Sequence, residues 1–136
     1  AHAILEAEIS NLNAALDVAR KASVVLSASG FLVVPADLAL LEPKDLAALL
    51  NRRAGDAMAT GCIVIAPDEI QHGTNALYMQ PIDSIAFAFG TNSFDEHRAA
   101  AIRAGCAVNI IARANLSFDV DNPEDLTQLD KIFWQI

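Results

Sequence analysis

Two aspartates stand two positions apart in the acidic stretch Phe118-Asp119-Val120-Asp121. If this stretch is a strand, Asp119 and Asp121 lie on one face, because alternate side chains of a strand point the same way. Two carboxylates about 5 Å apart repel each other by roughly 3 kcal/mol at an effective dielectric of about 20, and a divalent cation turns that repulsion into attraction. Magnesium suits such a sparse carboxylate set because it keeps several waters. In the alternative reading, Asp121 or Asn122 caps the following helix and Asp119 faces solvent.

A third carboxylate, Asp37, directly follows the apolar run from Phe31 to Ala36. Open α/β sheets bind their ligands at the carboxyl ends of strands, so Asp37 is expected to join Asp119 and Asp121 at one edge of the sheet. Three carboxylates at strand ends, in a chain with few charges, favour a magnesium site. The alternative is that Asp37 only caps the turn toward Leu38.

Two loops contain the residue types that hold a small anion. They are Gly73-Thr74-Asn75 and Gly90-Thr91-Asn92-Ser93, and the second opens a predicted helix. Free amides and the helix dipole attract phosphate or carboxylate at such an end, and Gly90 allows a ligand to approach the backbone closely. Ser93 and Glu96 form a capping-box pattern, so Ser93 is expected to cap the helix as well as contact the anion. Plain turn and capping chemistry is the alternative for both loops.

The other candidate groups favour structural roles. His97 is interpreted as a surface or packing residue, and His2 and His72 have no ligand spacing. Cys62 and Cys106 are 44 positions apart beside apolar residues, which favours buried thiols over a disulfide. No serine or cysteine has the neighbours of a catalytic nucleophile.

Composition narrows the classes of partner. Seventeen acidic and nine basic residues give the 136-residue chain a net charge of −8, which disfavours nucleic acid and anionic membranes. No apolar run approaches the roughly 20 residues of a membrane span, and no signal-peptide pattern opens the chain, so a cytoplasmic protein is expected.

Short apolar runs alternate with segments of helical period, which is typical of an α/β domain with a mostly parallel sheet and flanking helices. One domain is expected over residues 1–136. In the C-terminal helix, Leu126, Leu129 and Phe133 are expected to point inward. We expect helices over residues 12–22, 43–53, 93–104 and from 123 onward, and strands over 31–34, 63–66, 76–79, 108–111 and 116–121.

Four motifs, taken in order and with their spacing, resemble the 2-phospho-L-lactate guanylyltransferase family of coenzyme F420 biosynthesis, which includes a phosphoenolpyruvate-using form. The motifs are Val34-Pro35-Ala36-Asp37-Leu38, Gly73-Thr74-Asn75-Ala76-Leu77, Phe87-Ala88-Phe89-Gly90 with Ser93-Phe94, and the stretch from Asp119 to Leu126. The resemblance implies a nucleotidyltransferase-like fold that joins GMP from GTP to a small phosphorylated three-carbon acid and releases pyrophosphate. By the same resemblance Asp37, Asp119 and Asp121 are the catalytic magnesium ligands, and Thr74, Gly90 and Ser93 hold the acid.

The chain departs from the family pattern in three ways. Ala39 stands where a proline is usual and Asn11 where a glycine is usual, and neither position carries charge. The family's N-terminal nucleotide-binding strand and basic loop are absent, and the six glycines match no dinucleotide or triphosphate cradle. The chain is therefore expected to be the C-terminal portion of a longer enzyme and inactive alone, with GTP and a phosphorylated acid as partners and homodimer formation left open.

Two other functions remain as alternatives. A related nucleotidyltransferase with another acceptor, such as a sugar phosphate, would share the aspartates but should lack the two small-residue loops. A non-catalytic remnant would keep the motifs for packing and act as a binding or assembly module. A haloacid-dehalogenase phosphatase is excluded by position, because its Asp-x-Asp follows the first strand.

Overall fold

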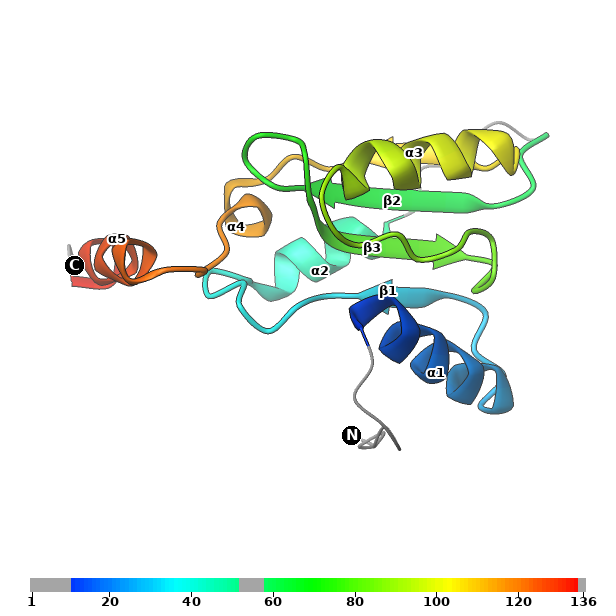
Figure 1. The fold of residues 1–136 in the computed structure, drawn as a ribbon, viewed down its shortest axis with the longest axis horizontal. Helices are drawn as coiled ribbons and strands as arrows, with labels where there is room; N and C mark the ends of the chain where they lie inside the picture. Colours follow the sequence, from blue (N-terminus) through cyan, green and yellow to red (C-terminus); the bar gives the residue numbers. More distant parts are fainter. Residues whose placement is uncertain (1–10, 52–57, 135–136) are drawn as a thin grey trace.

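The computed structural model describes residues 11–51 and 58–134 of the chain (Figure 1). Its helices are α1 (Leu12–Val25), α2 (Pro43–Leu50), α3 (Ser93–Arg103), α4 (Ala114–Ser117) and α5 (Pro123–Trp134). Its strands are β1 (Phe31–Val33), β2 (Cys62–Pro67), β3 (Thr74–Gln80) and β4 (Ala107–Ile110). The expected α/β composition is therefore confirmed.

The strands form one mixed sheet in the order β1-β3-β2-β4. Strand β3 runs antiparallel to both β1 and β2, with Met79 opposite Phe31 and Ile63, and only β2 and β4 are parallel. The prediction of a mostly parallel sheet is wrong. The reason is the short loop 68–73 between β2 and β3, because a parallel pair needs a crossover of about a dozen residues or more and a loop this short makes a hairpin.

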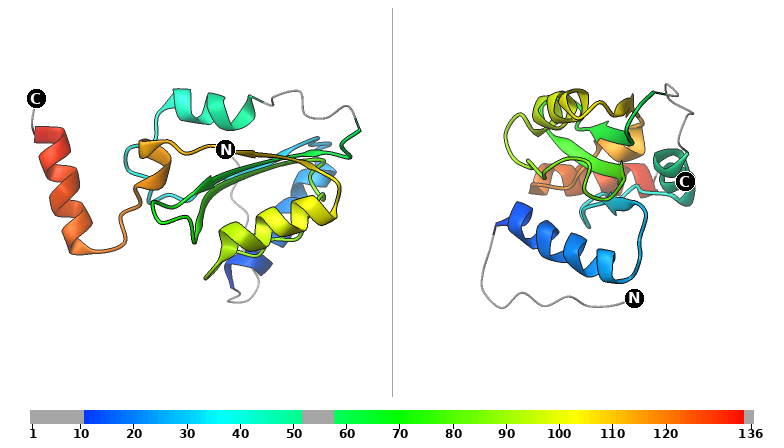
Figure 2. Two further views of the ribbon diagram at one scale, coloured as in Figure 1. Left: turned by 90° about the horizontal axis from the view of Figure 1, so that it is seen from above. Right: turned by 90° about the vertical axis from the view of Figure 1, so that its right-hand side faces the viewer.

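Alternating side chains of the central strands divide the core between the two faces of the sheet. Ile63 and Ile65 of β2 pack on the face covered by α1 and α3, whereas Val64 and Ala66 pack on the face covered by α2 and α4 (Figure 2). All four side chains are fully buried. These strands read as continuous apolar runs because both of their faces are covered.

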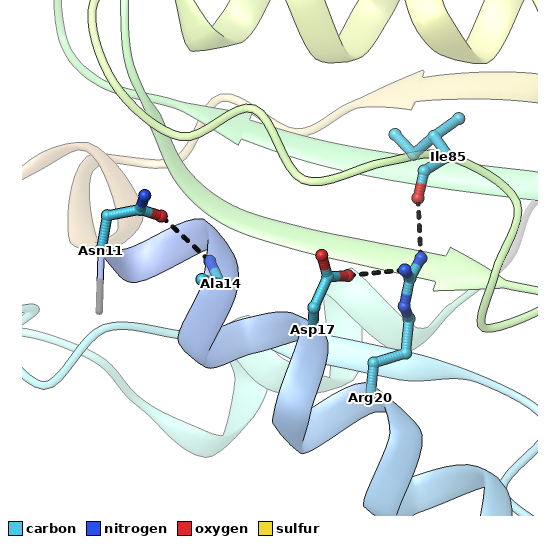
Figure 3. Close-up of polar contacts among 5 residues, drawn as sticks. All are labelled: Asn11, Ala14, Asp17, Arg20 and Ile85. Atoms are coloured by element: carbon cyan, nitrogen blue, oxygen red, sulfur yellow. Dashed lines mark hydrogen bonds and ion pairs between the residues drawn. The ribbon is translucent and has the colours of Figure 1, made fainter. Parts of the chain in front are cut away.

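Polar contacts cap helix α1 and join it to the segment after β3 (Figure 3). Asn11 caps the helix, since its side-chain oxygen accepts a hydrogen bond from Ala14 N–H at 3.0 Å. Arg20 donates to Asp17 at 2.6 Å and to the carbonyl of Ile85 at 3.2 Å. The bond to Ile85 ties α1 to the segment that leads from β3 to α3.

Most predicted boundaries are confirmed to within three residues. The helix predicted over 43–53 ends at Leu50, and residues 52 and 53 lie outside the described residues. The strand predicted over 116–121 is wrong. In its place α4 ends at Ser117 and an irregular segment follows.

Helix α5 projects from the end of the molecule rather than packing on the sheet (Figures 1 and 2). Leu126 is 54% exposed and Phe133 51% exposed, Leu129 is half-buried, and no residue of the helix is buried. The prediction that these three side chains point inward is therefore wrong. Helical period identifies an apolar face, but it does not say whether another element lies within reach of that face.

Cys62 and Cys106 are free thiols, as expected, although each is half-buried rather than fully enclosed. Among the described helices, none is long and apolar enough to cross a membrane.

Candidate functional site

A cavity of about 520 Å³ opens where β1 and β2 end and β3 begins. Its walls come from segments that are far apart in the sequence, and they include α1, the loop after β2 and the start of α3. All six residues predicted from the sequence line this one cavity: Asp37, Thr74, Gly90, Ser93, Asp119 and Asp121.

The aspartates reach the cavity from two segments that are joined through the backbone. Asp37 lies in the turn after β1, and its carbonyl accepts a hydrogen bond from Val120 N–H at 3.2 Å. This bond holds the turn beside the irregular segment that carries Asp119 and Asp121. Asp119 and Asp121 thus line the same cavity, although they do not lie on one face of a strand as the sequence suggested.

Asp119 has an unfavourable electrostatic environment for a carboxylate. Burial raises its pKa, and the negative charges of Asp121, Asp37 and Asp68 raise it further. Asp68 completes a group of four carboxylates around the cavity, because it lines the wall as well.

The acidic stretch also contains the cap of the helix that follows it. The cap of α5 is Asn122, whose side-chain oxygen accepts from Glu124 N–H at 3.0 Å and from Asp125 N–H at 3.1 Å. Asp125 in turn accepts from the backbone N–H groups of Asp121 and Asn122. The carboxylate of Asp121 is therefore not used for capping.

The carboxylates at the cavity are candidate ligands for a cation. Within the described residues, no three acidic, histidine or cysteine side chains are grouped closely enough to hold one ion jointly. Magnesium binds through one or two carboxylates, with waters and substrate phosphates as its other ligands, so the donor set fits this ion.

The loop before α3 leaves open space at the cavity. Gly90 has φ +140°, a conformation that other residues rarely adopt, and a Cβ atom added there would meet nothing within 4 Å. The backbone of Gly90 is thus accessible to a ligand from within the cavity.

Ser93 has a different role in α3 from the one predicted. The N-cap is Asn92, in the left-handed conformation with φ 61°, and Ser93 is the first helical residue. The amides of Ser93 and Phe94 already bond to the carbonyls of Gly90 and His72, so these two are not free for an anion. The Ser93 side chain is almost fully buried, and no hydrogen bond of its hydroxyl group is found within residues 11–51 and 58–134.

Thr74, the first residue of β3, bonds to a histidine behind the cavity wall. Its Oγ1 lies 3.0 Å from Nδ1 of His97 on α3. His97 is fully buried, in agreement with its interpretation as a packing residue, and its ring meets the ring of Phe89 edge-on at 4.9 Å. Burial lowers the pKa of His97 to about 4, so the ring is neutral near pH 7.

Sequence reasoning missed Asp68, which shapes the loop before Thr74. Its carboxylate accepts hydrogen bonds from the backbone N–H groups of His72 and Gly73, both at 2.8 Å. A Cβ atom at Gly73 would lie 2.8 Å from the same carboxylate, so a side chain there would displace Asp68. The rule that selected Asp37, a carboxylate directly after an apolar run, selects Asp68 equally well after β2.

Asn13 of α1 was also missed. Its side chain pairs with the backbone of Phe89 in both directions, because Nδ2 donates to the Phe89 carbonyl at 3.1 Å and Oδ1 accepts from Phe89 N–H at 2.8 Å. This pair fixes the segment just before Gly90. A single polar residue in a helix gives no local signal of such a contact.

The chain is thus an α/β domain with a mixed sheet and a carboxylate- and hydroxyl-lined cavity at its strand ends. Residues 1–131 match the family model described as "Guanylyl transferase CofC like". The chain belongs to this guanylyltransferase family.

Several relatives agree with this membership. The chain is 45% identical over 119 residues to a phosphoenolpyruvate guanylyltransferase of Rubrobacter xylanophilus, covering 88% of this chain and 56% of the relative. It is 38% identical over 117 residues to a phosphoenolpyruvate guanylyltransferase of Chloroflexus aggregans, with 86% and 55% covered. It is 33% identical over 98 residues to a 2-phospho-L-lactate guanylyltransferase of Methanothermobacter thermautotrophicus, with 72% and 41% covered. The chain spans about half the length of the curated relatives it matches.

Proposed function

We propose that this chain forms the acceptor and metal side of an enzyme that joins GMP from GTP to a small phosphorylated three-carbon acid. The product would serve coenzyme F420 biosynthesis, as the family resemblance implies. The observation that carries the proposal is that the three predicted aspartates and the three predicted acid-binding residues line one cavity.

The reaction needs alignment of two anions more than it needs a protein nucleophile. An oxygen of the acid's phosphate attacks the α-phosphorus of GTP, a new P–O bond forms, and the bond to the leaving pyrophosphate breaks. Asp37, Asp119 and Asp121 would between them supply the one or two carboxylates that each magnesium ion needs, and the ion when bound neutralises the charge of the phosphates. Thr74, Gly90 and Ser93 would hold the acid so that its phosphate faces GTP.

Two features of the cavity support a small anionic acceptor. Gly90 lets the backbone approach the ligand without a side chain in between, and the hydroxyl groups of Thr74 and Ser93 supply hydrogen-bond donors without bulk. We propose 2-phospholactate, phosphoenolpyruvate or 3-phosphoglycerate as the acceptor. These acids differ only in geometry or in one hydroxyl group.

The test uses the full-length protein with GTP, Mg²⁺ and each acid in turn, and follows pyrophosphate release. Ser93→Ala should raise the KM of the preferred acid about tenfold, the cost of one hydrogen bond to a charged group, and leave the KM of GTP unchanged. Thr91→Ala is the matched control, because Thr91 is an exposed hydroxyl residue of the same loop outside the cavity lining. Release with another acceptor and with none of the three acids would refute the substrate assignment.

We further propose that the 136 residues alone do not turn over GTP, because they contain no glycine-rich pattern that cradles a triphosphate. Pyrophosphate release by this chain should be at background level when the full-length protein is active under the same conditions. Equal rates would contradict the proposal and mean that the described cavity binds both substrates.

A further inference from the structure

His97 stands one layer behind the cavity, and both nitrogen atoms of its ring are engaged. Nε2 accepts a hydrogen bond from the backbone N–H of Ala88 at 3.0 Å, and Nδ1 lies 3.0 Å from Oγ1 of Thr74. The ring itself does not line the cavity, whereas Thr74 does. His97 therefore connects the segment before Gly90 to the first residue of β3.

The contact with Ala88 decides where the ring carries its proton. A backbone N–H can only donate, so Nε2 must be the unprotonated nitrogen. A neutral imidazole holds one proton, which then resides on Nδ1. The ring is neutral near pH 7 because burial lowers its pKa to about 4. His97 is thus the Nδ1–H tautomer, and it donates to Thr74.

This tautomer also settles the direction of the Thr74 hydroxyl. Oγ1 accepts a hydrogen bond from His97 Nδ1–H, so the hydrogen of the Thr74 hydroxyl group must point to another acceptor. Within residues 11–51 and 58–134, no hydrogen bond from this hydroxyl group to a protein acceptor is found. Since Thr74 lines the cavity, the free O–H is available to an oxygen atom of a ligand there.

We propose that His97 is a positioning residue for the acceptor acid: its Nδ1–H holds the Thr74 hydroxyl so that the hydroxyl proton is donated to an anionic oxygen of the acid. This rests on the proposed function of the cavity. The hydrogen bonds run in one direction, from Ala88 N–H to His97 and from His97 to Thr74 to the ligand. Each bond in such a chain polarises the next, so Thr74 is a better donor than an isolated threonine.

Two substitutions separate the two ends of the ring. The amide of asparagine reaches the place of Nδ1, so His97→Asn can still donate to Thr74. The longer glutamine reaches the place of Nε2, so His97→Gln can still accept from Ala88 but no longer directs the threonine. A purely structural histidine would be replaced better by glutamine, because the contact with Ala88 and more of the buried volume are kept.

The kinetic test measures pyrophosphate release by the full-length protein with GTP, Mg²⁺ and the preferred acid. We expect His97→Gln to raise the KM of the acid about tenfold, which is the effect of losing one hydrogen bond to a charged group. The KM of His97→Asn should stay within about threefold of the wild-type value. The KM of GTP should be unchanged in both variants. The opposite ranking of the two variants would overturn the proposal.

Thr74→Val provides the decisive background, because it removes the hydroxyl group and keeps the shape of the side chain. Thr74→Val alone should raise the KM of the acid about tenfold, and His97→Gln added to it should cause no further rise. A further rise of the same size would show that His97 acts through general packing and not through Thr74, which would overturn the proposal.

A spectroscopic measurement tests the tautomer without any turnover. In the full-length protein labelled with ¹⁵N-histidine, the His97 signal, assigned by its loss in His97→Gln, should show the Nδ1–H tautomer at pH 7. An Nε2–H tautomer or a protonated ring would overturn the proposal, even in a fully active enzyme. If the wild-type protein releases no pyrophosphate with any of the three acids, the proposed function fails, and the ligand role of Thr74 fails with it. The tautomer measurement distinguishes the two failures: an Nδ1–H signal in such a protein means that the proposed function is wrong, although the hydrogen bonds of His97 are as described.

Discussion

At the scale of single residues, Asp119 carries a carboxylate where negative charge is unfavourable. Its folded-state pKa is raised by burial and by Asp121, Asp37 and Asp68, so its charged form lowers the stability of the folded protein. Residues that bind a cation are often arranged at such a cost, because the ligand later relieves it.

Asp119→Asn should therefore stabilise the protein at pH 7 while removing most of its activity. The gain should be a few tenths of a kcal/mol, since solvent still screens a half-buried carboxylate. It should shrink as pH falls through the folded pKa and vanish well below the unfolded value of about 3.9, where Asp119 is protonated in both states. Thermal and urea unfolding from pH 3 to pH 7 measures this effect.

Asp130→Asn is the control for this variant, because Asp130 is an exposed carboxylate on α5. Its effect on stability should be close to zero over the same pH range. Magnesium should raise the melting temperature of the wild-type protein more than that of Asp119→Asn. Equal shifts in the two proteins would count against a cation near Asp119.

At the scale of elements, a buried carboxylate joins α2 to the segment that precedes α4. Asp45 is 1% exposed and pairs with Arg113 Nε at 2.7 Å. It also accepts hydrogen bonds from Asn115 and from the backbone N–H of Glu42, both at 3.0 Å. Burial alone would raise the pKa of Asp45, but these hydrogen bonds and the charge of Arg113 outweigh burial and lower it.

Asp45→Asn should lower the free energy of unfolding by about 2 kcal/mol at pH 7, because a buried charge-assisted network loses its anion. The folded pKa lies below the unfolded one, so the contribution of Asp45 is complete above about pH 4 and is lost as pH falls through the folded value. The difference between the two proteins should narrow below pH 4. Asp83→Asn, at an exposed loop position, should show no such difference. A constant difference at all pH values would refute the electrostatic explanation.

Helix α1 should affect the cavity through Asn13. In Asn13→Leu the backbone of Phe89 loses both of its side-chain partners, so the segment before Gly90 is released. We expect a loss of about 1–2 kcal/mol in stability and a several-fold rise in the KM of the acid. Lys21→Leu, an exposed position further along the same helix, is the control. If Asn13→Leu loses stability and keeps an unchanged KM, α1 supports the fold without shaping the cavity.

At the scale of the whole molecule, the apolar face of α5 should contribute little to stability. Phe133 is 51% exposed and Trp134 is 82% exposed. Changing both to serine should alter the free energy of unfolding by less than about 0.5 kcal/mol, whereas Phe87→Ala in the core should cost about 3–5 kcal/mol. Urea unfolding measures both variants. A loss above about 2 kcal/mol in the α5 variant would mean that this face is covered in solution.

Local patterns were enough to predict the positions of most elements but not the arrangement of the sheet. The strand over 63–66 and the start of the helix at residue 12 depend on neighbouring residues, and both predictions are confirmed. The strand order and the direction of β3 depend on contacts between distant segments, which periodicity does not record. The three aspartates that line the cavity were predicted as site residues because charge stands out beside apolar runs. Asn13 and His97 were not assigned a role at the cavity, because their partners, Phe89 and Thr74, are remote in the sequence.

The conformation of Gly90 also limits how the cavity can change in evolution. Open space in front of position 90 would admit a larger side chain, yet a φ of +140° makes every other residue strained there. A single codon change at this position is thus penalised by the backbone rather than by the ligand. The shape of the cavity can change more freely on α1, where Leu12 and Leu16 line the same cavity from a regular helix.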